Sequence, residues 1–172
     1  GCKLLERVII TSHEEFQAKP GCFYNLSKIN RVLVTSRRVI IGGYCFEYCS
    51  SMTSLSVLGS DDTILGPHAF CNCSKLETVD ISGYYKLRLG SFCFYKASNL
   101  KSVTINCNEC LIGGLCFDKC SSLNQINAPT AKKVKYFENS FNGQINCPDT
   151  AKKDPIVDRI NKNEDEQNCL IS

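Results

Sequence analysis

The chain has few of the features that mark membrane-spanning and nucleic-acid-binding proteins. No apolar run approaches the roughly 18 residues that a membrane-spanning helix needs, so a helical span is not expected. No block of lysine and arginine is longer than two residues, and 20 basic side chains stand against 17 acidic ones. A nucleic-acid footprint therefore has no electrostatic support, and we expect no nucleic acid among the partners.

Motifs for catalysis and cofactor binding are also scarce. The sequence has no Walker loop, no dinucleotide-binding fingerprint and no His-Glu-x-x-His helix. Only two histidines occur, His13 and His68, and both fall in turn-like segments with no serine or cysteine nucleophile placed consistently beside them. We therefore predict that the protein is not an enzyme, has no cofactor and takes no small-molecule substrate.

What the sequence does have is an internal repeat. Phenylalanine returns every 23 or 24 residues, at Phe23, Phe46, Phe70, Phe94, Phe117 and Phe141. Apolar residues stand three and six positions after each of the first five of these Phe residues. Nine and eleven positions after each of the five comes a pair of apolar residues separated by one other residue. A second alternating pair ends five residues before the next Phe, and a glycine usually follows it. Around Phe70 these positions hold Thr63, Leu65, Gly66, Cys73, Leu76, Val79 and Ile81. Each alternating pair predicts a short strand with one buried face.

The length of the period predicts the fold. It lies within the leucine-rich-repeat range of about 20–29 residues, and no single coil of this size buries its own apolar face, so the coils must stack. We predict a leucine-rich-repeat solenoid over residues 1–144 with about five full coils, each with two short parallel strands and a helical or irregular return. We expect the chain to begin partway through an earlier coil, an atypical last coil around Phe141, and a flexible polar tail over residues 145–172.

Two segments carry a family resemblance. Residues 41–52, Ile-Gly-Gly-Tyr-Cys-Phe-Glu-Tyr-Cys-Ser-Ser-Met, and residues 65–76, Leu-Gly-Pro-His-Ala-Phe-Cys-Asn-Cys-Ser-Lys-Leu, resemble the I-G-x-x-A-F-x-x-C-x-x-L signature of BspA-like leucine-rich repeats. The resemblance covers roughly residues 2 to 142. It departs from the signature at Leu26 and Ala97, where cysteine is expected, and at Phe137, where the corner glycine is expected. The resemblance implies a repeat scaffold, in a family that includes bacterial surface adhesins and numerous protist proteins.

The 13 cysteines admit three interpretations. Eight lie in two columns next to the repeated Phe, where Ala69 and Ala97 also occur, so the column requires a small apolar group and favours buried free thiols. Disulfides between adjacent coils are the second interpretation, because stacked strands lie only about 4.8 Å apart. Metal ligation is the third, but Cys71–Cys73 and Cys107–Cys110 lack a second matched pair at zinc spacing. We therefore predict no metal site.

The outward positions of the first strand in each coil form a candidate protein-binding face. Solenoids bind partners on such stacked strand faces, although a merely solvated sheet face would have the same polar composition. The candidate residues are Arg31, Ser54, Ser56, Thr78, Asp80, Ser102, Thr104, Gln125 and Asn127.

The sequence ends in a candidate lipidation site. Cys169-Leu-Ile-Ser172 is a C-terminal cysteine, two aliphatic residues and a serine, the box that predicts farnesylation of Cys169, although in a cysteine-rich chain it can also arise by coincidence. Some eukaryotic chains that resemble the BspA-like family end in the same way. Residues 151–172 carry four bases and five acids. The tail therefore offers no basic second anchor, and membrane attachment is expected to be reversible.

Together these observations predict a protein-binding scaffold in the cytoplasm, tethered by prenylation to the inner face of a membrane, which we expect to be the plasma membrane. Prenylation takes place in the cytosol, where thiols stay reduced. The alternative is an exported surface adhesin whose cysteines form disulfides between repeats.

Overall fold

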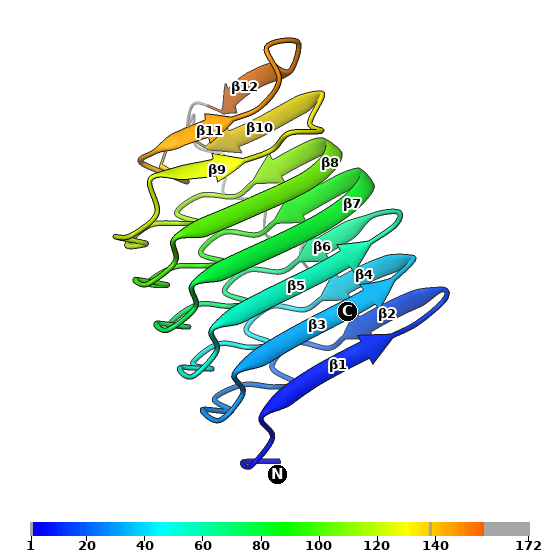
Figure 1. Ribbon diagram of the computed structural model, residues 1–172, viewed down its shortest axis with the longest axis vertical. Coiled ribbons are helices and arrows are strands. Elements are labelled where there is room, and N and C mark those ends of the chain that lie inside the picture. The colour runs from blue at the N-terminus through cyan, green and yellow to red at the C-terminus, as the bar shows by residue number, and fades with distance from the viewer. Residues whose placement is uncertain (1, 138, 157–172) are drawn as a thin grey trace.

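The computed structural model describes residues 2–137 and 139–156, which form a solenoid of 12 parallel strands (Figure 1). The coils stack along the long axis of the molecule, from β1 beside the N-terminus to β12 at the opposite end. The predicted leucine-rich-repeat solenoid is confirmed, in a mainly β form. Because the described residues form no helix, none of them provides a helix that is long and apolar enough to cross a membrane.

The first strand of each coil contributes to one sheet surface. Its members are β1 (Arg7–Thr11), β3 (Arg31–Ser36), β5 (Ser54–Gly59), the first halves of β7 (Thr78–Leu89) and β8 (Ser102–Ile112), β9 (Gln125–Asn127) and β11 (Gln144–Asn146). The register repeats once per coil, so Val32 lies beside Leu55, which lies beside Val79. These partners all point into the core, which fixes the register because a slip by one residue would expose the whole row.

The second strand of each coil contributes to the second sheet surface. Its members are β2 (Glu15–Ala18), β4 (Arg38–Ile41), β6 (Thr63–Leu65), the second halves of β7 and β8, β10 (Lys133–Phe137) and β12 (Lys152–Ile156). In β7 and β8 the two strands of a coil run together into one long bent strand, with a register irregularity between Gly83 and Lys86. The two expected strands per coil are therefore present.

Tight turns, not a helix, close the third side of each coil. The Cys49 N–H donates to the Phe46 carbonyl at 3.2 Å, and the Met52 N–H donates to the Cys49 carbonyl at 3.0 Å. The apolar spacing of three residues, which had suggested a near-helical return, reflects these consecutive turns. The Phe46 N–H donates to the Ala69 carbonyl of the next coil at 2.8 Å, so buried backbone groups find partners between coils as well.

The repeated phenylalanines form a stacked ladder through the core. Phe46, Phe70 and Phe94 are fully buried, and their ring centroids lie 5.2 and 5.4 Å apart with the rings within 9° of parallel. Phe23 and Phe117 extend the stack at each end, at 4.7 and 5.2 Å. One continuous hydrophobic core therefore runs through successive coils.

The cysteine column beside this ladder has a second role besides packing. Its thiols donate hydrogen bonds to the carbonyl of the Phe one coil earlier, from Cys49 to Phe23 at 3.3 Å, from Cys73 to Phe46 at 3.2 Å and from Cys120 to Phe94 at 3.1 Å. Each described cysteine is a free thiol, and nine are buried. The signature cysteine thus combines small apolar volume with a donor that alanine lacks.

The corner glycines allow adjacent coils to approach closely. Among the described glycines only Gly21 has a positive φ, so the corner glycines are not needed for left-handed backbone angles. At Gly90 an added Cβ would lie 2.5 Å from the backbone nitrogen of Pro67 and 2.7 Å from the carbonyl carbon of Gly66. The left-handed positions in the turns belong instead to residues such as Tyr44 and Phe92.

The solenoid continues beyond its predicted boundary. We had placed the start of a flexible tail at residue 145, but β11 crosses that point and β12 extends the stack to Ile156. Ile145 pairs with Ile126 of β9, and Lys153 pairs with Val134 of β10. Hydrogen bonds between backbone groups form this ladder, and they require no apolar side chains. The polar sequence of β12 therefore gave no sign of a strand. Residues 157–172 lie outside the described part of the chain.

Candidate protein-binding surfaces

The nine residues predicted as a binding face lie on the outer side of the first sheet surface, in two adjacent rows. Register places Arg31, Ser54, Thr78, Ser102 and Gln125 in one row and Ser56, Asp80, Thr104 and Asn127 in the other. All nine are exposed or half-buried. Arg31 and Asp80 are the only charged members, so this face is polar but nearly neutral. The sequence correctly predicted that these side chains point outward. Their role in binding a partner stays a prediction.

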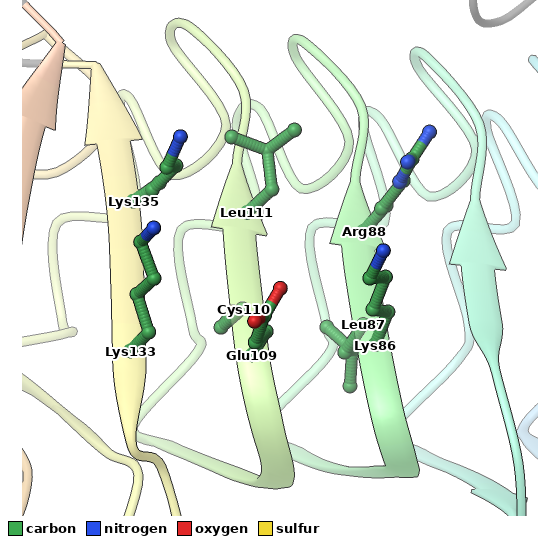
Figure 2. A pocket seen from close by; sticks show the side chains of 8 residues that line it. All are labelled: Lys86, Leu87, Arg88, Glu109, Cys110, Leu111, Lys133 and Lys135. Carbon is green, nitrogen blue, oxygen red and sulfur yellow. The ribbon is translucent and has the colours of Figure 1, made fainter. Parts of the chain in front are cut away.

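A groove lies on the second sheet surface, over β7, β8 and β10 (Figure 2). We call it the basic groove and define it by the outward side chains Lys86, Arg88, Glu109, Leu111, Lys133 and Lys135. Its volume is about 210 Å³. The buried side chains of Leu87 and Cys110 alternate with these and point to the core, as strand geometry requires.

Register sets the charge pattern of the basic groove. One row contains Lys86, Glu109 and Lys133, and the next contains Arg88, Leu111 and Lys135. Figure 2 shows two cations on each outer strand flanking Glu109 and Leu111 on the central one. Four positive charges face one negative charge across three neighbouring strands.

The groove cations form no ion pair within the described part of the chain, although Asp154 of β12 is the register neighbour of Lys135. The ion pairs found there join Arg37 to Glu14, Arg38 to Glu15 and Lys101 to Glu77. None involves a side chain of the basic groove. A net positive groove with unpaired ammonium and guanidinium groups attracts anionic ligands.

Sequence reasoning missed this groove, although its signal was present. The charged positions lie beside the second alternating pair of each coil, which we used only to define a strand. Aligning coils on their Phe would have brought Lys86, Glu109 and Lys133 into one column. Alternation along each strand would then have placed Arg88, Leu111 and Lys135 in the adjacent column.

A third surface is the turn edge, which carries stacked and exposed aromatic rings. His68 is sandwiched between Tyr44 and Phe92, with ring centroids 4.8 Å away on either side and planes within 9° of parallel. All three occupy left-handed backbone positions, at φ of 55–58°. Tyr24 and Tyr48 are also about half exposed there. The stack holds the imidazole of His68 in one orientation.

Next to this stack the structure assembles a group of three potential metal ligands. One ligand atom each from Glu47, His68 and Cys71 lies within 4.8 Å of the others. His68 and Cys71 belong to one tight turn, closed by the hydrogen bond from the Cys71 N–H to the His68 carbonyl at 3.1 Å, and Glu47 comes from the coil before. The sequence had predicted no metal ligands, because Cys71 was compared only with cysteines nearby in sequence.

The same group is unsuited to nucleophilic catalysis. Burial and the neighbouring Glu47 carboxylate raise the pKa of the Cys71 thiol to about 12, and burial lowers the pKa of His68. At neutral pH the thiol therefore keeps its proton, and a protonated thiol is a poor nucleophile. The pairing of histidine and cysteine does not change the prediction of a non-catalytic protein.

The predicted lipidation site, Cys169, lies outside the described residues. It stays a prediction.

Comparison with known proteins identifies the repeat. The family model of the BspA type leucine rich repeat region matches residues 16–148 in six copies. A search of curated proteins and a search of solved structures each returned no match. Solenoids of this kind are typically protein-binding scaffolds. The matched region includes the Phe ladder, the cysteine columns and most of both sheet surfaces, and the chain therefore belongs to the BspA-type leucine-rich-repeat family.

Proposed function

We propose that the protein is a binding scaffold that captures an acidic segment of a partner protein in the basic groove. The observation that carries this proposal is the arrangement of Lys86, Arg88, Lys133 and Lys135 around Glu109 and Leu111 on three adjacent strands. The scaffold displays these charges at a fixed spacing, about 4.8 Å between neighbouring strands. Leu111 adds a half-buried apolar surface between Arg88 and Lys135.

The expected interaction is multivalent and sensitive to salt. An exposed ion pair contributes only about 0.2–1 kcal/mol, so one lysine would not hold a partner. Several pairs formed together add up, and the field of the groove speeds the encounter with an acidic chain. Screening over about 8–10 Å in physiological salt limits the attraction to segments that lie in the groove itself.

A fluorescence-anisotropy titration with a short labelled peptide of alternating glutamate and serine tests this proposal. We expect Lys133→Glu combined with Lys135→Glu to weaken binding about tenfold or more, because two lost ion pairs of up to about 1 kcal/mol each sum to as much as about 2 kcal/mol, and a tenfold change needs about 1.4 kcal/mol. The matched control is a peptide in which lysine replaces glutamate, which the wild-type groove should repel.

The first sheet surface is the competing location. A variant with bulk or charge at Ser56, Thr78 and Thr104 together leaves the basic groove intact. If this variant abolishes capture of the acidic peptide and the Lys133/Lys135 variant does not, the interface lies on the predicted strand face and our assignment to the groove is wrong.

We further propose that prenylation of Cys169 tethers the scaffold to the cytosolic face of the plasma membrane. The free thiols throughout the described coils support a reducing compartment, and the terminal Cys169–Ser172 box supports the lipid. Membrane fractionation and intact mass of the C-terminal peptide, compared between the full chain and Cys169→Ser, test it. An unmodified Cys169 still followed by Leu170, Ile171 and Ser172 would eliminate the tether.

The exported adhesin is the alternative to this cytosolic tether. Thiol counting on protein unfolded without reductant separates the two: nearly all 13 cysteines free supports the cytosolic scaffold. Only a few free would support the adhesin.

A further inference from the structure

The turn edge brings together three side chains of the types that bind metal ions. We propose that Glu47, His68 and Cys71 bind a single zinc-class divalent cation and leave a fourth coordination position open to solvent. The site would lie between two consecutive coils, on the turn edge and not on either sheet surface.

The geometry and the donor types fit such an ion. Zinc binds a thiolate sulfur at about 2.3 Å and imidazole nitrogen or carboxylate oxygen at about 2.0–2.2 Å, usually in tetrahedral geometry. Those bond lengths place ligand atoms about 3.3–3.8 Å from one another. The three donor atoms here already lie within 4.8 Å of one another. Side-chain movements of about 1 Å would therefore bring them to the distances of a bound zinc ion.

The charge of the site favours a cation. Glu47 is 9% exposed and Cys71 only 3%, and Glu47 takes part in none of the ion pairs with lysine or arginine in the described part of the chain. With the Glu47 carboxylate close to the Cys71 thiol and no lysine or arginine of the described residues paired with it, the site attracts a cation. Lys96 is near enough to influence Cys71, but its ammonium lies over the Tyr95 ring, 5.3 Å from the centroid.

The surroundings hold the ligands in place. The His68 ring is fixed between Tyr44 and Phe92, which holds its imidazole nitrogens in one orientation. The Asn72 side-chain amide donates to the Cys71 sulfur at 3.2 Å. Hydrogen bonds to a ligand sulfur from outside the coordination shell are typical of metal centres.

The repeat itself supplies an internal comparison. At the other coil junctions around it, the three equivalent positions hold Tyr24, Tyr44 and Glu47; Cys71, Phe92 and Tyr95; and Tyr95, Leu115 and Asp118. Among these, only the junction between the Phe46 and Phe70 coils brings three metal-ligating side chains together. If the fold required these residue types, they would recur at each coil junction. Glu, His and Cys come together at this junction and not at the three compared with it.

Titration with Co²⁺, which reports zinc sites by its absorption spectrum, tests the proposal on the full chain kept reduced. We expect the visible bands of a tetrahedral site and a sulfur-to-cobalt charge-transfer band, saturating at a single ion per chain and abolished by added Zn²⁺. Cys71→Ser should remove the charge-transfer band. His68→Gln and Glu47→Gln should each weaken binding about tenfold or more, since even residues outside the coordination shell contribute 10–100-fold.

Two controls keep the result specific. Cys22→Ser removes an exposed thiol of the same turn edge, and His13→Gln removes the other histidine; both should bind Co²⁺ like the wild type. If the band survives in Cys71→Ser, or if the wild type shows no tetrahedral bands, the proposal is wrong. His68→Gln affects a partly exposed side chain and keeps the test valid if Cys71→Ser fails to fold, as circular dichroism would reveal.

Discussion

Removal of one ring from the aromatic ladder should destabilise the whole solenoid. Phe70 is fully buried and stacks on Phe46 on one side and Phe94 on the other. Burial of the ring contributes about 1.5–3 kcal/mol, and each stacked pair about 0.5–1.5 kcal/mol more. Because neighbouring coils are hydrogen-bonded on three sides and cannot collapse fully into the space, we expect Phe70→Ala to lower the free energy of unfolding by about 3–5 kcal/mol.

Equilibrium urea unfolding followed by circular dichroism measures this loss. The control is Thr78→Ala, on the exposed row of the first sheet surface, for which we expect a change below about 0.5 kcal/mol. Similar losses at the two positions would refute the assignment of Phe to the core column and of Thr78 to the outer face, and with it the repeat register.

Two further predictions concern the thiols and the corner glycines. Burial raises the pKa of Cys120 to about 12 and that of Cys116 well above 9.0. The folded state therefore retains protons that the unfolded chain releases near pH 9, and each thiol should cost about 1.4 kcal/mol of stability per pH unit between about pH 9 and its folded pKa. Urea midpoints that do not change between about pH 8 and about pH 10 would contradict buried free thiols. Gly90→Ala should cost about 1–3 kcal/mol because its Cβ would meet the backbone of Pro67. At Gly114 the nearest atom is the Asn139 side chain at 3.3 Å, so Gly114→Ala should be milder in the same assay, and an equal loss would refute the close approach of the coils at Gly90.

The sequence was sufficient for the fold because the repeat makes each coil a copy of the same pattern. Phe70, Cys73 and Leu76 appear with the same spacing as Phe46, Cys49 and Met52, so their common environment follows from stacking. A spacing of three residues does not separate a helix from consecutive turns, and the turn geometry became visible only in the backbone hydrogen bonds. Polar β12 was missed because its ladder uses backbone groups alone.

The candidate sites were harder to predict because they combine residues from different coils. Glu47 and Cys71 are 24 residues apart, one full period, so no short ligand spacing in the sequence reveals them. The groove depends likewise on Lys86, Glu109 and Lys133 meeting across three strands. Once the coils are aligned with one another, the sequence predicts which residues of the metal-ligand group and of the basic groove become neighbours. It does not predict the distances between the donor atoms.

The most direct test of the proposed function is an amide NMR titration with the acidic peptide. We expect chemical-shift changes at residues 86–88, 109–111 and 133–135, on the three strands of the basic groove, and we expect added salt to reverse them. Residues of the first sheet surface, on the other side of the core, should not respond. Shifts confined to that surface, or no shifts at all, would contradict the assignment of partner binding to the basic groove.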